Sequence, residues 1–231
     1  MPRDNFNFPS HANARLYLEE HVRKNIPGFE IREKTASLRM IFLSRVLFFV
    51  PGFMTNFTTT LYPKVYVPCL QRWEADNVFS TTTLAHEYVH LSDRKRMSLV
   101  FNFLYLVPQI FAVFALLFPY NSWFLLFLSC LLPMPSPGRA WAEYRGYRMS
   151  MAVHYWLTGE KHNIDQLVHQ FISSNYYWMF PFEGFMRKRF ERAFEDIQQN
   201  NLSAELKEVK KVLTTAFFCE TLKARGKQWI Q

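Results

Sequence analysis

The chain has 231 residues, a formal net charge of +8 at neutral pH, an aromatic content of 18% and 24 phenylalanines. This length suits one substantial domain, and the three widely spaced cysteines, Cys69, Cys130 and Cys219, argue against a disulfide framework or a thiolate zinc site and suit a reducing compartment. The charge favours solubility or attraction to an anionic membrane surface, and the lack of a basic run with a recognition motif argues against nucleic-acid binding.

Residues 1–34 are predicted to form a polar N-terminal arm. Within it, residues 12–24 are expected to form a short helix that stops near Pro27 and Gly28. The polar start of the chain, residues 1–20, has no apolar segment of the kind that a cleavable signal peptide requires, so none is expected there.

Residues 35–54 form the first apolar stretch, with a helical spacing that Arg39 and Arg45 interrupt. The stretch is too short and too charged for a clean membrane span. Two interpretations are equally open for it. It is either a helix at a membrane interface, with its arginines reaching lipid headgroups, or an ordinary helix of the core.

Residues 55–68 are rich in Thr, Tyr and Val and predict one or two β-strands, which Pro63 and Pro68 restrict to edges or ends. A strand edge at this place in the chain could hydrogen-bond the backbone of an extended substrate. The alternative is a small sheet that only covers the neighbouring helix, and the two interpretations are compatible.

The next helix is expected to begin at Asp76 or Ser80, either of which can cap it, and to end near Arg96. Asp93 lies three residues after His90, on the same side of this helix, where it could orient a ligand imidazole. The alternative, which we favour from the sequence, is a solvated residue on the helix surface.

This helix carries the most specific motif of the chain, His86-Glu87-Tyr88-Val89-His90. Residues four apart lie one turn above each other on one helix face, so the imidazoles of His86 and His90 can bind one Zn²⁺. Glu87 then lies beside the metal, where its carboxylate can act as general base toward a water molecule. The alternative is an ordinary helix whose histidines are solvated or hydrogen-bonded.

Residues 99–132 contain no charged side chain and are predicted to form an apolar helical hairpin. Residues 99–118 match the roughly 20-residue length of a helix that crosses a bilayer, residues 119–121 are a turn signal, and the return over residues 122–133 is short. Because basic residues flank both ends, the hairpin is expected to enter a membrane from the cytoplasmic side. The alternative is a hairpin buried in a soluble protein. The flanking residues are Arg94, Lys95, Arg96, Arg139, Arg145 and Arg148.

A catalytic zinc usually has three protein ligands, and Glu143 is the best candidate for the third. It lies near the start of a helix predicted over residues 139–158, within an otherwise apolar and aromatic segment. Gly146 would allow this helix to approach the first one closely. The alternative role of Glu143 is an ion pair with Arg139 or Arg145.

Together these features resemble the gluzincin metallopeptidases, which carry His-Glu-x-x-His on one helix and a glutamate ligand on a later one. The apolar hairpin between the two helices resembles the membrane-embedded zinc endopeptidases of the CAAX prenyl protease and heat-shock membrane protease group. That group follows its glutamate with Ala-Asp-Arg, whereas here Glu143 is followed by Gly146, Tyr147 and Arg148. Tyr147 thus replaces the aspartate that orients a ligand histidine in that group.

The resemblance covers residues 55–150. It implies that His86, His90 and Glu143 bind zinc and that Glu87 is the general base.

No group that would stabilise an oxyanion stands out from the sequence. Tyr147, Arg148 and Tyr144 are candidates by their proximity to Glu143. His154 lies on the same helix face, but about 16 Å further along it.

Two amphipathic helices are predicted near the C-terminus, over residues 183–199 and 202–222. Residues 176–182 form an aromatic cluster that suits a membrane interface, the core or a substrate pocket. His162 and His169 are expected to be surface histidines rather than a second metal-binding pair.

The sequence therefore predicts a mainly α (α+β) fold, with a zincin-like metallopeptidase core over residues 35–159 that includes the hairpin at 99–132. Residues 160–231 are expected to pack on this core as a helical region. The predicted function is hydrolysis of a peptide or protein substrate with Zn²⁺ as cofactor, at the cytoplasmic side of a membrane whose lipid contacts the hairpin. Two alternatives stay open: a zinc hydrolase of a non-protein amide or lipid-linked substrate, and a non-enzymatic membrane adaptor with a degenerate motif.

Overall fold

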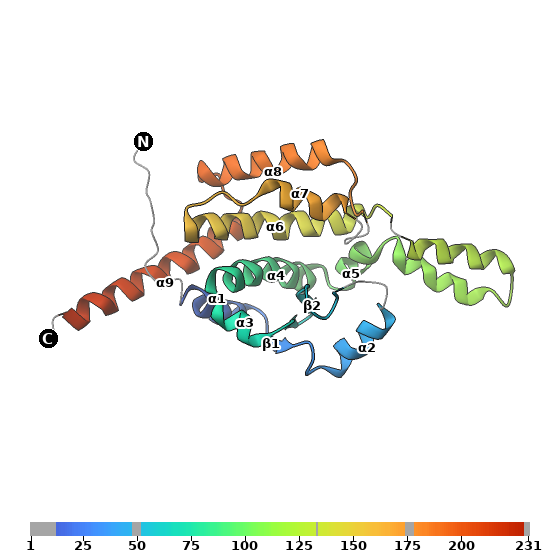
Figure 1. The fold of residues 1–231 in the computed structure, drawn as a ribbon, viewed down its shortest axis with the longest axis horizontal. Coiled ribbons are helices and arrows are strands. Elements are labelled where there is room, and N and C mark those ends of the chain that lie inside the picture. The colour runs from blue at the N-terminus through green and yellow to red at the C-terminus, as the bar shows by residue number, and fades with distance from the viewer. Residues whose placement is uncertain (1–12, 48–51, 133, 174–177, 229–231) are drawn as a thin grey trace.

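Two long helices, α4 (Asn77–Met97) and α6 (Pro137–Thr158), pack against each other at the centre of the molecule (Figure 1). They run in opposite directions, because Ser150 on α6 contacts Thr82 on α4 while Glu143 lies against His90. The structure is a computed structural model that describes residues 13–47, 52–132, 134–173 and 178–228, with side chains up to Phe218. Over these residues the chain is mainly helical, with a small mixed sheet of three strands.

The other elements surround this central pair. The further helices are α1 (Ala14–Asn25), α2 (Leu38–Val46), α3 (Leu70–Ala75), α5 (Leu99–Leu106), α7 (Ile164–Ile172), α8 (Glu183–Gln198) and α9 (Ala204–Gln228). Two 3-10 helices, η1 (Gln109–Leu117) and η2 (Ser122–Leu131), form the apolar hairpin. The strands are β1 (Glu30–Glu33), β2 (Thr59–Leu61) and β3 (Lys64–Val67).

Both central helices begin and end close to where the sequence predicts. The Asp76 side chain accepts a hydrogen bond from the Phe79 amide at 2.9 Å and so caps α4. Helix α6 begins with Pro137, whose fixed φ suits a first turn, and ends before Gly159, which has a φ of +74°. Short-range capping signals thus define the two elements that carry the predicted ligands.

The sheet has the order β1-β3-β2, with β1 parallel and β2 antiparallel to the central strand β3. The predicted strands in residues 55–68 are confirmed as the β2–β3 pair, in which Thr60 is opposite Val65. Val65 and Val67 are buried in the core, as alternate β-branched side chains on one face of a strand favour. Strand β2 is an edge of this sheet, and its Thr60 side chain reaches α4.

Helix α1, within the segment predicted as a polar arm, contributes directly to the core. Leu18 and Val22, followed by Ile26, are almost completely buried, because their four-residue spacing puts all three on one face toward α4 and α9. On the other side of the central pair, α7 and α8 cover α6 through Phe171 and Phe190 (Figure 1).

The hairpin of η1 and η2 projects away from the body, as the yellow-green pair in Figure 1. The prediction of a single helix over residues 99–118 is wrong. Helices α5 and η1 are bent by 87° around Val107 and Pro108, since Pro108 has no amide hydrogen with which to continue the helix. Among the described residues no single helix is long and apolar enough to cross a membrane, whereas α5 and η1 together meet those criteria of length and composition.

The segment 35–54 is also not one helix. Helix α2 covers only part of it, residues 48–51 lie outside the described residues, and a turn follows over residues 52–56. In α2, Met40 is buried while Phe42 is exposed, so this helix belongs only partly to the core.

The C-terminal predictions are largely confirmed, since α8 and α9 lie close to the two expected amphipathic helices. The aromatic cluster at residues 176–182 begins outside the described residues. In its described part, Trp178 and Phe182 are exposed, whereas Met179 is buried.

Candidate metal centre

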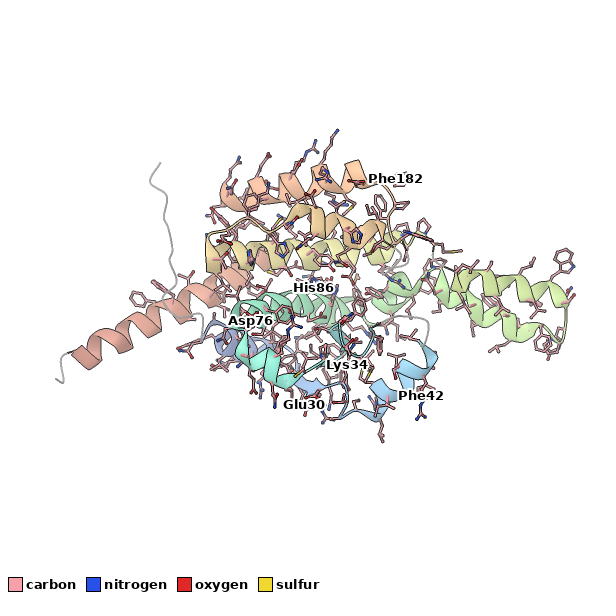
Figure 2. The ribbon with its side chains drawn as sticks, viewed as in Figure 1. Glu30, Lys34, Phe42, Asp76, His86 and Phe182 are labelled. Atoms are coloured by element: carbon pink, nitrogen blue, oxygen red, sulfur yellow. The ribbon has the colours of Figure 1, made fainter. Side chains whose placement is uncertain are left out.

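Three side chains meet where α4 and α6 touch: His86 and His90 from α4, and Glu143 from α6. One donor atom of each lies within 4.8 Å of the other two, so the group could hold a metal ion. The two histidine Nε2 atoms are 3.0 Å apart, and oxygens of Glu143 lie 3.3 Å from the Nε2 of His86 and 3.7 Å from that of His90. All three residues are largely buried, in the interior position where Figure 2 labels His86.

These separations fit a small ion with four ligands. Tetrahedral coordination with bonds of about 2.0–2.1 Å places neighbouring donor atoms about 3.3–3.4 Å apart. The three observed distances lie around that value. Two imidazole nitrogens and one carboxylate oxygen leave a fourth position for a non-protein ligand, which is the arrangement of catalytic rather than structural zinc sites.

Gly146 allows the two helices to approach this closely. It lies one turn after Glu143 on α6, and a Cβ atom at this position would be 2.6 Å from the Nε2 and 2.7 Å from the Cε1 of His86. The missing side chain therefore leaves space for the His86 ring and for an ion beside its Nε2 atom. The close helix approach predicted for Gly146 is confirmed.

Burial and charge act in opposite directions on these groups. Burial lowers the pKa of His86, but the carboxylates of Glu143 and Glu87 outweigh it, and the pKa lies above its ordinary value. Burial keeps the pKa of His90 below its ordinary value, against the effect of Glu143. Burial raises the pKa of Glu143, but the two histidines and a hydrogen bond from Tyr105 outweigh it and lower that pKa to about 2. Glu143 is thus ionised at neutral pH and suited to bind a cation.

The second nitrogens of the two histidines have different surroundings. The Nδ1 of His86 lies 3.5 Å from the hydroxyl of Ser150 on α6. The Nδ1 of His90 is buried and has no hydrogen-bond partner among the described residues. Metal-bound histidines usually donate a hydrogen bond from this second nitrogen, which fixes the ring. By this criterion, the ring of His86 is better oriented for metal binding than the ring of His90.

Glu87 follows His86 on α4 and is also buried. The hydroxyl of Thr60 on β2 donates to the Oε2 of Glu87 at 2.6 Å. Lys34, which follows β1, interacts electrostatically with this carboxylate. Burial lowers the pKa of Lys34 to about 8, and the negative charge of Glu87 opposes this shift. The same carboxylate acts to raise the pKa of His86 and His90. Glu87 is therefore close both to the sheet and to the metal-binding group.

The residues proposed from the sequence as oxyanion donors take different positions. The ring of Tyr147 packs edge-on against His86, with centroids 4.8 Å apart. Tyr144 and Arg148 instead line a cavity against α8 and α9, together with Arg189. Of the three, Tyr147 is the one that touches the metal-binding group.

Among the described residues, Asp93 is neither solvated nor hydrogen-bonded to His86 or His90. It is 2% exposed and forms an ion pair with Arg145, which also pairs with Glu205 at the start of α9. Both expectations from the sequence were wrong, because they did not include the arginine that α6 brings to this face of α4.

Three further histidines, His154, His162 and His169, lie outside this group. His154 contacts His162, with ring centroids 5.1 Å apart, and His169 is exposed on α7. His154 lies within α6 and His162 follows the end of this helix. The sequence drew attention to the seven-residue spacing between His162 and His169 and did not indicate the contact with His154.

Two supporting residues were missed from the sequence. Tyr105 on α5 donates its hydroxyl hydrogen to the Oε1 of Glu143 at 2.6 Å, and Thr60 holds Glu87. The available signal for Tyr105 was a hydroxyl in an otherwise apolar segment, which needs a partner when it is buried. Thr60 had no such signal, because Thr58 and Thr59 precede it and look alike.

Comparison of the chain with protein-family models, with curated proteins and with solved structures finds no match.

Proposed function

We propose that this protein is a zinc-dependent hydrolase that cleaves peptide bonds, built on a zincin-like core. The observation that supports this most is the convergence of two histidines and one glutamate from α4 and α6, with the carboxylate of Glu87 close by. A structural zinc is usually enclosed by four protein ligands, whereas this group offers three. The donor set therefore favours an ion that keeps a position for water or substrate.

The chemistry follows from the types of these residues. Zn²⁺ held by His86, His90 and Glu143 would lower the pKa of a water molecule to about 7 and polarise the scissile carbonyl. Glu87 would accept a proton from the attacking water and deliver it to the departing amine. The hydrogen bond from Thr60 keeps the carboxylate of Glu87 in one orientation for both transfers.

The edge strand β2 supports a peptide as the substrate. Thr60 on β2 touches Glu87, so this edge of the sheet lies next to the proposed base. An edge strand offers unpaired backbone groups to which an extended peptide can add as a further strand. We propose that the substrate pairs with β2 in this way. A non-protein amide would not use the edge and is our second candidate, and a non-enzymatic adaptor is the third.

Metal content of the purified protein is the first test. We expect stoichiometric zinc in the wild type and a strong reduction in His86→Ala and Glu143→Ala. His169→Ala is the matched control, because His169 is exposed on α7 and should not change the zinc content. Zinc kept in Glu143→Ala would show that the third ligand is misassigned, and no zinc in any sample after reconstitution would favour the adaptor.

Hydrolysis of a peptide library is the second test. Glu87→Gln should keep zinc and lose about 10²- to 10⁴-fold in rate, the usual contribution of a positioned general base. Glu191→Gln, at an exposed position on α8, serves as its control and should leave the rate unchanged. Full activity in Glu87→Gln would overturn this mechanism.

A further inference from the structure

Three segments that are far apart in the sequence expose large apolar side chains at one end of the molecule. The hairpin projects from this end, and Phe42 on α2 and Phe182 before α8 lie on either side of its root (Figure 2). We call this surface the apolar end, formed by α2, by residues 99–132 and by residues 178–185. Phe42 is 67% and Phe182 is 64% exposed.

The hairpin has little contact with anything except itself. Within η1 and η2, which are fully described, Ala115 is the only buried residue. Phe114 and Phe127 connect the two helices, with ring centroids 5.3 Å apart, while Leu116 and Trp123 are each 73% exposed. An apolar surface of this extent marks a contact with a partner or a membrane.

The exposed side chains surround the hairpin rather than forming one stripe. A 3-10 helix has three residues per turn, and one of them in each turn, such as Ala115 or Phe127, faces the other helix. The remaining positions point outward on both sides, as Val113 and Leu117 do in η1 and Leu125 and Leu126 do in η2. A protein groove covers one face of a helix, whereas lipid chains surround it, so this distribution favours lipid.

The length of the hairpin suits a single leaflet. The nine residues of η1 and the ten of η2 make arms of about 18–20 Å at a rise of about 2.0 Å per residue. Half of a hydrocarbon core of about 30 Å is about 15 Å. Both arms start from one root, where Ser136 donates to the carbonyl of Val107 and Arg139 donates to the side chain of Gln109 at 3.2 Å. The chain therefore enters and leaves through the same membrane face.

The charges near α2 and the hairpin are suited to anionic headgroups. The sequence has no Asp, Glu, Lys or Arg between Arg96 and Arg139, and no Asp or Glu between Glu33 and Glu74. Arg39 and Arg45 are exposed on α2 within this acid-free stretch. Basic groups beside an inserted segment are attracted by anionic lipids.

We propose that the apolar end docks on an anionic phospholipid bilayer, with η1 and η2 inserted into one leaflet and with Phe42 and Phe182 at the level of the headgroups. This docking is independent of the proposed hydrolysis, because it uses none of the metal-binding side chains. It holds the metal centre near the membrane surface, since Tyr105 on α5 connects the hairpin root with Glu143.

Vesicle flotation of the full chain tests the docking. The Glu87→Gln variant, transferred from detergent to vesicles of phosphatidylcholine and phosphatidylglycerol, should float with them whether or not it hydrolyses peptides. In the same Glu87→Gln background, the double substitution Leu116→Asp with Trp123→Asp should lower the fraction of protein bound to vesicles at least about tenfold, because each charge would enter hydrocarbon. Leu16→Asp on α1, at a site that is 49% exposed, is the matched control and should bind normally.

Two further variants test the flanks of the hairpin. Phe42→Asp and Phe182→Asp should each weaken binding by less than the change at the hairpin. Arg39→Gln with Arg45→Gln should weaken binding several-fold to the mixed vesicles and not to pure phosphatidylcholine. Equal circular dichroism spectra of all variants would show that they are folded. If the full chain with an unchanged hairpin bound neither kind of vesicle, the proposal would be overturned and a protein partner would be indicated.

Fluorescence quenching tests the depth of insertion. The contribution of Trp123, obtained by comparison with Trp123→Phe, should be quenched most by a nitroxide near the end of the lipid acyl chain. Strongest quenching by a headgroup nitroxide would place the hairpin on the surface and overturn insertion into the leaflet.

Discussion

Gly146 is the residue on which the geometry of the metal-binding group depends most directly. A Cβ atom there would lie 2.6 Å from the Nε2 of His86, and this ring is confined by Tyr147 and His90. We predict that Gly146→Ala displaces the ring and lowers zinc affinity by about 10- to 100-fold, the usual effect of disturbing groups that orient a ligand. Competition with a chromophoric chelator measures this change.

Gly184 provides the matched control for this substitution. It also lies in a helix, α8, but a Cβ atom there would meet nothing within 4 Å. Gly184→Ala should keep zinc affinity and stabilise the helix by up to about 1 kcal/mol. Equal zinc affinities for the two variants would contradict the role given to Gly146.

The burial of Lys34 makes the stability of the folded protein depend on pH. Its ammonium group is buried and donates to the carbonyl of Phe53, and burial lowers its pKa to about 8 from an ordinary value of 10.5. Between these values the unfolded chain binds more protons than the folded one, so the free energy of unfolding increases with pH. From about pH 7.5 to about pH 9.5 we expect it to increase by about 2 kcal/mol more in the wild type than in Lys34→Met.

Urea unfolding of both proteins at the two pH values measures this difference. The comparison removes groups that titrate equally in both proteins. Parallel profiles would mean that the amine of Lys34 is not depressed in pKa by its burial.

At the level of elements, Arg145 joins three helices. It extends from α6 to Asp93 on α4 and to Glu205 on α9. Burial raises the pKa of Asp93 while Arg145 opposes that shift, which is the pattern of a charge kept in the interior by its partner. We predict that Asp93→Asn lowers the free energy of unfolding by about 3 kcal/mol, because it leaves the guanidinium without its buried partner.

An exposed ion pair of the same kind is the control for this prediction. Arg187 pairs with Asp165, whose side chain is 73% exposed. Asp165→Asn should cost less than about 1 kcal/mol, as exposed pairs usually do. Chemical unfolding measures both variants, and similar small losses would refute the structural importance of the Arg145 cluster.

Local signals in the sequence predicted the helices that have clear ends. Asp76 and Pro137 mark the starts of α4 and α6, and Gly159 marks the end of α6. The hairpin shows the limit of such signals. Residues 99–118 are apolar except for Asn102 and Gln109 and predict one helix. Pro108 divides this helix, and the angle between the two parts depends on contacts at the root.

For the whole molecule, the His-Glu-x-x-His motif and Glu143 were predictable, because a metal site needs specific side chains at specific spacings. The side chains around them were not. Tyr105 and Thr60 come from α5 and β2, and only the packing of these elements on α4 and α6 brings their hydroxyls to the site. Strand β1 was also missed, because its pairing with β3 is a contact between distant segments.

The order of the segments along the chain has a consequence for synthesis. His86 and His90 leave the ribosome before the hairpin, and Glu143 leaves after it. A nascent chain therefore cannot bring the three donor atoms together until the hairpin has emerged. The hairpin is therefore available for contacts of its own before the metal-binding group can be completed. We expect that a ribosome-bound chain that ends before Glu143 does not hydrolyse peptides.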